Sequence, residues 1–284
     1  MPKLLSEAQV AAYHRDGYLF PLKAFAPTKM HATRERFDAL CIREGGRLSQ
    51  HTNTKPHLLV TWLADLVRHA LVLDAVEDLI GPNLLCWGAG FFHKPAHAPD
   101  FVSWHQDSTY WGLSRPDVVT AWIALTPSVP LSGCMRVMPG TQTRDQLAHR
   151  DTFANDNMLS RGQEVDVEVD PTKAVDIVLQ PGEFSLHHVR IVHGSEPNRA
   201  DWPRVGFAIR YIPTDIRQVS EVRDSATLVR GHDAFGNFDF EPAPRSDFHP
   251  DAVAFHNKAI ARTRQILLAG AADKREDTAP RPTA

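Results

Sequence analysis

Apolar positions in the N-terminal third of the chain recur mainly at helical spacing. Ser6 is a suitable helix cap and Gln9 can bond back to it, so a short helix is predicted to begin there and to end near Gly17. A first strand is predicted at 18–20. Three further stretches carry apolar residues every three or four positions and are predicted to be helices: 27–45, 58–63 and 67–80.

After Gly81 the pattern changes to short apolar or alternating runs separated by glycine and proline, which is typical of an antiparallel sandwich or barrel. Eight runs are predicted to be strands: 84–94, 101–107, 118–125, 135–138, 174–179, 184–188, 191–193 and 205–212. This is about the number of strands that a jelly roll needs. The fold class predicted is therefore mainly β with flanking helices.

The remaining segments surround this β-rich core. Residues 141–171 are polar and poorly periodic, and are interpreted as a long excursion that borders a pocket. No linker divides the chain, so we predict a single domain over 1–270. The helical third, 1–80, is expected to pack on a β core at 84–213. Residues 214–270 are expected to form a loop layer and a last helix at 251–268. The tail at 271–284 is predicted to be disordered.

Composition limits the possible partners. The chain has 31 Lys and Arg against 34 Asp and Glu, a net charge of −3, which offers no long-range attraction to nucleic acid or to an anionic membrane. Three scattered cysteines are too few for a disulfide framework and suit a reducing compartment. No apolar run is long enough to span a bilayer, and no signal region is evident. We therefore expect a soluble cytoplasmic protein with a small-molecule substrate, whose oligomeric state the sequence leaves open.

The stretch His105-Gln106-Asp107 carries the first chemical signal. His105 and Asp107 lie two positions apart at the end of an apolar strand, so both side chains are expected on one face. One later histidine can complete three ligands on one side of a metal and leave the opposite side open, as in iron sites that activate oxygen. The aromatic residues Tyr110 and Trp111 follow, and they are expected to wall the cavity.

Three histidines are candidates for the third ligand: His187, His188 and His193. His187 and His188 are adjacent, so at most one of them can share the pocket with His193. His193 is preferred because Gly194 and Ser195 follow it, which allows a cofactor to approach the backbone beside a hydroxyl donor.

Arg204 lies eleven positions beyond His193, at the start of the next apolar strand. If the intervening turn is a hairpin, Arg204 returns beside Ser195, and the pair offers a bidentate fork and a hydroxyl to a carboxylate. A dicarboxylate bound to the metal by one end and to Arg204 by the other would require all of these groups together.

This ordered series of residues resembles the phytanoyl-CoA dioxygenase family of iron- and 2-oxoglutarate-dependent oxygenases. The resemblance runs from about Phe92 to Tyr211. It is carried by motifs in the family's order: Lys94, His105-Gln106-Asp107, Trp122, Gly133-Cys134, Pro139-Gly140-Thr141, Pro181-Gly182-Glu183, His193-Gly194-Ser195 and Arg204.

The resemblance implies a double-stranded β-helix, the jelly roll also called cupin-like, with His105, Asp107 and His193 as catalytic iron ligands. Arg204 and Ser195 would hold the distal carboxylate of 2-oxoglutarate. Lys94, Gln106 and Trp122 would line the same cosubstrate pocket. The implied reaction consumes O2 and 2-oxoglutarate, releases succinate and CO2, and hydroxylates a C–H bond of the substrate.

Three other activities account for part of the pattern. Halogenases on the same fold vacate the carboxylate position so that chloride can bind iron, whereas here Asp107 is present. A non-catalytic cupin-like metal-binding protein or a zinc hydrolase can also use two histidines and a carboxylate. Neither explains Ser195 together with Arg204, so hydroxylation is the predicted activity.

The substrate itself is not identified by the sequence. Six residues flank the ligand strands or are expected to fold over them, and these are candidate substrate contacts: His51, Asn53, Trp104, Tyr110, Trp111 and Arg210.

Overall fold

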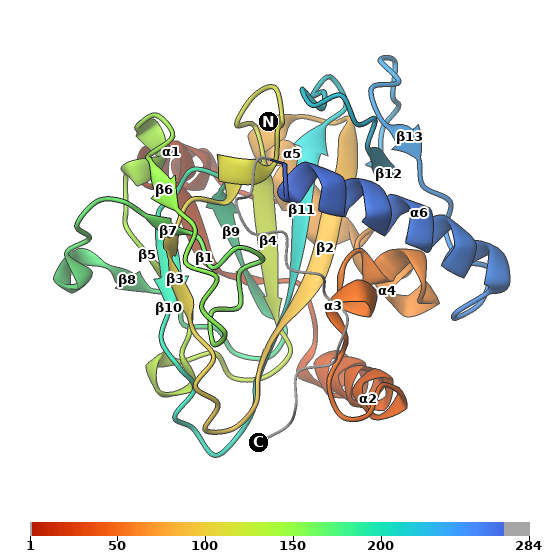
Figure 1. Cartoon of the computed structure of the whole chain (residues 1–284). Helices are drawn as coiled ribbons and strands as arrows, with labels where there is room; N and C mark the ends of the chain where they lie inside the picture. Colours follow the sequence, from red (N-terminus) through yellow and green to blue (C-terminus); the bar gives the residue numbers. More distant parts are fainter. Residues whose placement is uncertain (1, 270–284) are drawn as a thin grey trace.

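The N-terminal helix and the strand after it follow the predicted pattern. The computed structural model describes residues 2–269, and in it α1 spans Glu7–Asp16 and β1 spans Tyr18–Lys23 (Figure 1). Ser6 and Gln9 form the predicted capping box. Gly17 ends the helix with a φ of 86°, a left-handed conformation that glycine adopts without steric cost.

The next helices form a layer on one face of the molecule. They are α2 (Pro27–Arg43), α3 (Gln50–Asn53), α4 (Thr61–Leu66) and α5 (Ala70–Ile80), with a 3₁₀ turn, η1, at Pro56–Leu58. Helix α2 buries Met30, Thr33, Phe37 and Leu40, which recur at the spacing of one helical face. None of the described helices is long and apolar enough to cross a membrane.

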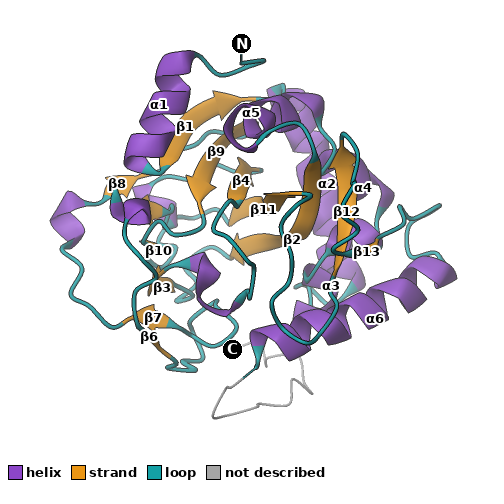
Figure 2. Cartoon of the chain, turned by 90° about the horizontal axis from the view of Figure 1, so that it is seen from above, coloured by secondary structure: helices purple, strands orange, loops and turns teal. Residues whose placement is uncertain are grey.

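A large, mostly antiparallel sheet forms the centre of the fold. Its strand order is β1-β9-β4-β11-β2-β12-β13. The strands that join β1 in it are β2 (Leu84–Lys94), β4 (Val119–Ala124), β9 (Glu183–His188), β11 (Arg204–Pro213), β12 (Ser225–Arg230) and β13 (Asp239–Phe240). Helices α2, α4 and α5 lie against this sheet, as the two views of the chain agree (Figures 1 and 2).

A smaller sheet, in the order β3-β10-β5-β8, lies beside the large one. Its strands are short: β3 (Val102–His105), β5 (Arg136–Val137), β8 (Val175–Asp176) and β10 (His193–Ser195). The excursion at 141–171 adds a two-stranded sheet of β6 (His149–Arg150) and β7 (Glu164–Val165). The two main sheets form the predicted jelly roll, the double-stranded β-helix, with its flanking helices.

The last part of the chain departs from the predicted loop layer. Residues 215–250 contain β12 and β13, and β12 pairs antiparallel with β2. Charged and turn-forming residues surround these strands, so their short apolar runs are hidden at the level of sequence. The last helix, α6 (Pro250–Leu267), is present as predicted. The predicted disordered tail lies outside the described residues.

Strand β11 separates two environments. Val205, Phe207 and Ile209 point into the core that the helices share with the large sheet. The alternate residues of β11 point to the opposite face, because successive side chains of a strand alternate. That inner face, which looks toward the small sheet, carries Arg204, Gly206, Ala208 and Arg210.

A buried polar cluster attaches the segment before η1 to β12 and the chain after β13. The Lys55 ammonium donates to Glu241 Oε1 and to the Ser225 carbonyl oxygen, each at 2.6 Å. Thr227 donates to the other Glu241 oxygen at 2.7 Å. Glu241 is fully buried, so its charge is balanced here by Lys55 rather than by water.

Glu241→Gln is expected to lower the free energy of unfolding by about 3 kcal/mol, because the buried Lys55 ammonium loses its nearest counter-charge. Burial alone raises the pKa of Glu241, but Lys55 and His57 lower it to about 2 from a usual 4.5. The stability from this carboxylate is therefore present above pH 4.5 and is lost as the pH falls toward 2.

Denaturant unfolding at several pH values measures both effects. The wild type should lose more stability than Glu241→Gln as the solution is acidified, whereas Glu168→Gln, at an exposed position, should match the wild type. Equal stability of Glu241→Gln and wild type at neutral pH would contradict the prediction.

Candidate metal centre

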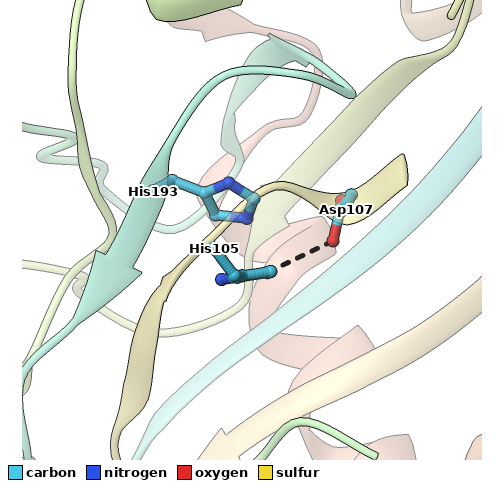
Figure 3. A group of neighbouring side chains, drawn as sticks. All are labelled: His105, Asp107 and His193. Carbon is cyan, nitrogen blue, oxygen red and sulfur yellow. Dashed lines mark ion pairs between the residues drawn. The ribbon is translucent and has the colours of Figure 1, made fainter. Parts of the chain in front are cut away.

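Three buried side chains from two strands and a turn converge between the sheets (Figure 3). The ligand atoms of His105, Asp107 and His193 all lie within 4.8 Å of one another. His105 and His193 are directly opposite each other on the paired strands β3 and β10, and their ring centroids are 4.1 Å apart. His105 Nε2 lies 3.3 Å from Asp107 Oδ1.

Backbone carbonyl groups orient both imidazole rings. His105 Nδ1 donates to the Ser103 carbonyl oxygen at 2.9 Å, and His193 Nδ1 donates to that of Ile191 at 3.0 Å. Each bond places the proton on Nδ1 and leaves the Nε2 lone pair free, which is the form that binds a metal. The two rings are therefore already oriented as ligands.

The charge states also suit a divalent metal. Burial lowers the pKa of His193 to about 4, so this ring is neutral at physiological pH. Burial by itself raises the pKa of Asp107, but the adjacent His105 and His193 rings and the Arg210 guanidinium hold it well below its usual value. Neutral imidazole nitrogen and carboxylate oxygen on one side of a metal is the donor set of non-haem iron oxygenases.

Asp107 reaches this position by a turn rather than by strand pleating. Strand β3 ends at His105, and Asp107 begins a 3₁₀ turn, η2, at Asp107–Tyr110. Its amide donates to the Val189 carbonyl oxygen at 3.1 Å, which fixes the start of that turn. The expectation of one extended strand through both ligands was therefore wrong in its local geometry.

The two other candidate histidines lie on opposite sides of β9, as their adjacency requires. His187 is buried with its ring centroid 5.1 Å from that of His193, and its Nδ1 has no hydrogen-bond partner among the described residues. His188 lies on the opposite side, where its Nδ1 accepts from the Arg190 amide and its ring is near Tyr13. Neither belongs to the group of mutually close ligand atoms.

A cluster of positive charge lies beside the metal centre. Arg204 and Lys94 are directly opposite on β11 and β2, and both are buried. Lys94 Nζ donates to Ser195 Oγ at 2.7 Å and to the Glu196 carbonyl oxygen at 2.5 Å. The Arg204 guanidinium lies 5.4 Å from the centroid of the Trp122 ring. Thus Arg204, Lys94, Ser195 and Trp122 come together, as the predicted cosubstrate contacts should.

The segment between Ser195 and Arg204 is not a hairpin. Strand β10 belongs to the small sheet and β11 to the large one, so residues 196–203 cross from one sheet to the other. Lys94 bridges the gap because it is opposite Arg204 and bonded to Ser195. The hairpin expectation was wrong, although the residues that it brought together do meet through this lysine.

Gln106 has a different set of contacts. Its amide nitrogen donates to the Arg190 carbonyl oxygen at 2.8 Å. Its amide oxygen accepts from Gln146 at 2.9 Å and from the Leu147 backbone at 2.8 Å. Gln106 thus ties the ligand strand to the excursion at 141–171, and its side-chain hydrogen bonds are to that segment and to Arg190 rather than to Arg204.

The six candidate substrate contacts do not all lie at the metal centre. Trp111 and Arg210 lie together, with the Arg210 guanidinium 5.9 Å from the Trp111 ring centroid, and Arg210 also acts electrostatically on Asp107. Tyr110 is the last residue of the turn that begins at Asp107, but its hydroxyl donates to Asp151 at 2.6 Å. Trp104 lines a cleft of about 330 Å³ on the other face of β3.

His51 and Asn53 lie at the helical layer and do not join the metal centre. His51 is exposed and bonds to Asn257 on α6 at 2.9 Å. Asn53 bonds to both backbone groups of Phe91 on β2, at 2.8 and 2.9 Å. These contacts anchor α3 to β2 and α6.

The sequence did not indicate two further groups that face the centre. Thr120 on β4 and Ser185 on β9 are buried with hydroxyl groups that lack a hydrogen-bond partner among the described residues. Both lie on the inner face of the large sheet, Thr120 opposite Arg210 and Ser185 opposite Trp122. Only the strand register reveals this, because both residues stand inside ordinary apolar runs.

Comparisons with known proteins agree on a family. The model of the phytanoyl-CoA dioxygenase (PhyH) family matches residues 13–206. A probable alpha-ketoglutarate-dependent hypophosphite dioxygenase of Stutzerimonas stutzeri is 30% identical over 163 residues, and the match spans 56% of each chain. Ectoine dioxygenase of Nocardia farcinica is 23% identical over 221 residues, which cover 69% of this chain and 74% of the relative.

Two solved structures share the fold over most of their length. The apo form of ThoJ, a non-heme monooxygenase, is 32% identical with a TM-score of 0.81, over 91% of this chain and 96% of its own. CytC3 with Fe(II) and alpha-ketoglutarate, another name for 2-oxoglutarate, is 26% identical with a TM-score of 0.64, over 86% and 94%. With a family match over more than half of its length and a His-Asp-His centre between its sheets, the chain belongs to the phytanoyl-CoA dioxygenase family.

Proposed function

We propose that the protein is an Fe(II)- and 2-oxoglutarate-dependent dioxygenase that hydroxylates a C–H bond of a small molecule. The observation that carries this proposal is the combination of a three-ligand centre with an adjacent buried cationic cluster. When bound, iron and 2-oxoglutarate supply the oxidation: O2 and 2-oxoglutarate become succinate and CO2, and one oxygen atom enters the substrate.

The cationic cluster fits the distal carboxylate of 2-oxoglutarate. Among the described residues no carboxylate forms an ion pair with Arg204, and its Nε has no hydrogen-bond partner. A buried guanidinium without a counter-charge is costly, so an anion from outside the chain is the expected partner. Arg204, Lys94 and Ser195 supply a fork, an ammonium and a hydroxyl for that anion.

The other residues of the pocket position and enclose the ligands. Trp122 packs flat against β11, where a Cβ on Gly206 would come within 1.9 Å of its ring, so glycine is required there. The indole thereby closes one side of the cationic cluster and excludes water from it. We propose His105, Asp107 and His193 as the catalytic iron ligands, with Trp122 lining the cosubstrate pocket. Gln106, by its contacts, would hold the 141–171 excursion beside it.

Halogenation is not favoured, because Asp107 fills the position that a halide would need on the metal. The relatives are named for hypophosphite, ectoine and phytanoyl-CoA, which share no single substrate class. We propose a small-molecule substrate and no nucleic-acid partner. Three free, buried cysteines support the cytoplasmic location that the composition indicates.

Anaerobic addition of ferrous iron and 2-oxoglutarate should produce a weak visible charge-transfer absorption in the wild type. His105→Ala and Asp107→Ala each remove one of three ligands, so both should abolish the absorption and lower succinate release in air by about 100-fold or more. His97→Ala, at an exposed histidine paired with Asp201, is the matched control. A wild type with neither absorption nor succinate release would refute the oxygenase assignment.

Binding of 2-oxoglutarate should weaken as the pH rises above 6. Burial and the neighbouring Arg204 lower the pKa of Lys94 to about 6, so the free protein loses this ammonium charge near neutral pH. A bound carboxylate favours the charged form, so binding takes up a proton, and the affinity should fall by up to about tenfold per pH unit.

Anaerobic titrations of 2-oxoglutarate at saturating iron, followed by the visible absorption, measure this slope. Lys94→Met should bind more weakly at pH 6 and show no slope, whereas Lys173→Met, which alters an exposed lysine, should behave as the wild type. The same slope in Lys94→Met would assign the proton to another group.

A further inference from the structure

Four neighbouring strands of the large sheet place one row of residues on its inner face. The register aligns His187 on β9 with Thr120 on β4, Thr120 with Arg210 on β11, and Arg210 with Gly88 on β2. The row lies next to the metal centre, since the His187 ring is in contact range of His193. Its residues therefore face the space beside the ligands.

Polar atoms in this row lack partners. The Thr120 hydroxyl, His187 Nδ1 and Arg210 Nε are buried, and none has a hydrogen-bond partner among the described residues. Buried polar groups are normally paired, and three unpaired ones on adjacent strands indicate a surface built to contact something else. Such a surface is expected where a polar ligand binds.

Arg210 is the charged member of the row. Its guanidinium lies 5.7 Å from the centroid of the Phe92 ring and 5.9 Å from that of Trp111. No described carboxylate forms an ion pair with it, and arginine stays protonated in proteins. The acid that interacts with it electrostatically is Asp107.

Asp107 cannot serve as the lasting counter-charge of Arg210. In the proposed function its carboxylate coordinates the metal, which neutralises it. Loading of the metal therefore leaves the half-buried Arg210, whose Nε is buried, without the acid that interacts with it, and an anion that enters beside it would restore the charge balance. Arg204 does not share this position, because it is at the other end of the β11 inner face with Lys94 and Ser195.

The structure leaves room for such an anion beside Arg210. A Cβ built on Gly88 would meet no atom within 4 Å, so there is open space over the residue opposite Arg210. Gly88 is also partly accessible, although the residues that flank it in β2 are buried. Arg210 is next to this space in the row, and Thr120 is its neighbour on the other side; the guanidinium and the hydroxyl are both donors.

We propose that Arg210, with the Thr120 hydroxyl and the space over Gly88, binds an anionic group of the substrate. The substrate class is thus a small molecule with a carboxylate or a phosphorus oxyanion. This inference rests on the proposed function and deepens it: Arg204 receives the cosubstrate carboxylate at one end of β11, and Arg210 receives the substrate anion at the Asp107 end.

Substrate-stimulated succinate release tests the inference with matched pairs of probes. The panel contains short-chain carboxylates with their amides, and alkylphosphonates with their dialkyl esters. In the wild type the anionic members should stimulate release at least tenfold more than their neutral partners. The carboxylate and phosphonate arms identify which anion is preferred.

Two variants distinguish the effect of the Arg210 charge from the effect of the open volume over Gly88. Arg210→Met removes the cation while it keeps much of the side-chain volume, and it should bring the anionic members down to the level of the neutral ones. Gly88→Val fills the space without a change of charge and should weaken stimulation by the anionic probes. Arg223→Met, which alters an exposed arginine paired with Asp239, should retain the wild-type preference.

The anaerobic absorption with iron and 2-oxoglutarate distinguishes the possible failures. Arg210→Met and Gly88→Val should keep it, and the melting temperature of Arg210→Met should not fall, because the variant loses a cation that has no partner. Loss of the absorption in a folded Arg210→Met would overturn the proposal. It would show that Arg210 positions Asp107 for the metal and does not bind the substrate. Retained anion preference in Arg210→Met, or a wild-type panel without anion-specific stimulation, would also overturn it. Failure of the wild type to show the absorption would instead refute the proposed function.

Discussion

The pairing of His193 with His105 across β10 and β3 is the constraint on which the metal centre depends. These residues are far apart in the sequence, and only the antiparallel register of two short strands places their rings 4.1 Å apart. Backbone carbonyl groups two residues before each histidine then fix the ring orientation. A shift of one residue in this register would turn one ring to the other face of the sheet and remove the centre.

Positively charged side chains have a carboxylate partner in one part of the fold and lack one in another. At the edge of the fold, Lys55 is buried with Glu241 as its direct partner, so a polar cluster joins distant segments without an unbalanced charge. On the inner face of β11, Arg204 and Arg210 have no such partner among the described residues. The cost of these cations has to be offset by the apolar core on the opposite face, where Phe207 and Ile209 pack with the helices. An uncompensated charge of this kind is typical of functional sites rather than of structural ones.

Local sequence patterns were sufficient to predict most helices and strands. They failed where an element depends on pairing with a distant strand. The strand at Leu84–Lys94 and the helix at Glu7–Asp16 carry their own apolar runs and end signals, and both were predicted closely. Strands β12 and β13 were missed because β12 depends on an edge supplied by β2, and β13 depends on β12 in turn. The hairpin expected between Ser195 and Arg204 was wrong, since nothing in a turn sequence states which sheet the next strand will join.

The sequence by itself determined the identity of the ligand-type residues, their order along the chain and the mainly β fold, because these depend on residue type and short-range periodicity. It also supported the choice of His193 over its neighbours through the small and hydroxylic residues that follow it. Only the tertiary structure decided that Lys94 joins Ser195 to Arg204, that Asp107 enters by a turn, and that Thr120, Arg210 and Gly88 form one row. The physical reason is that side-chain encounters across a sheet are set by strand register and sheet order, and these arise from long-range packing that no local stretch contains.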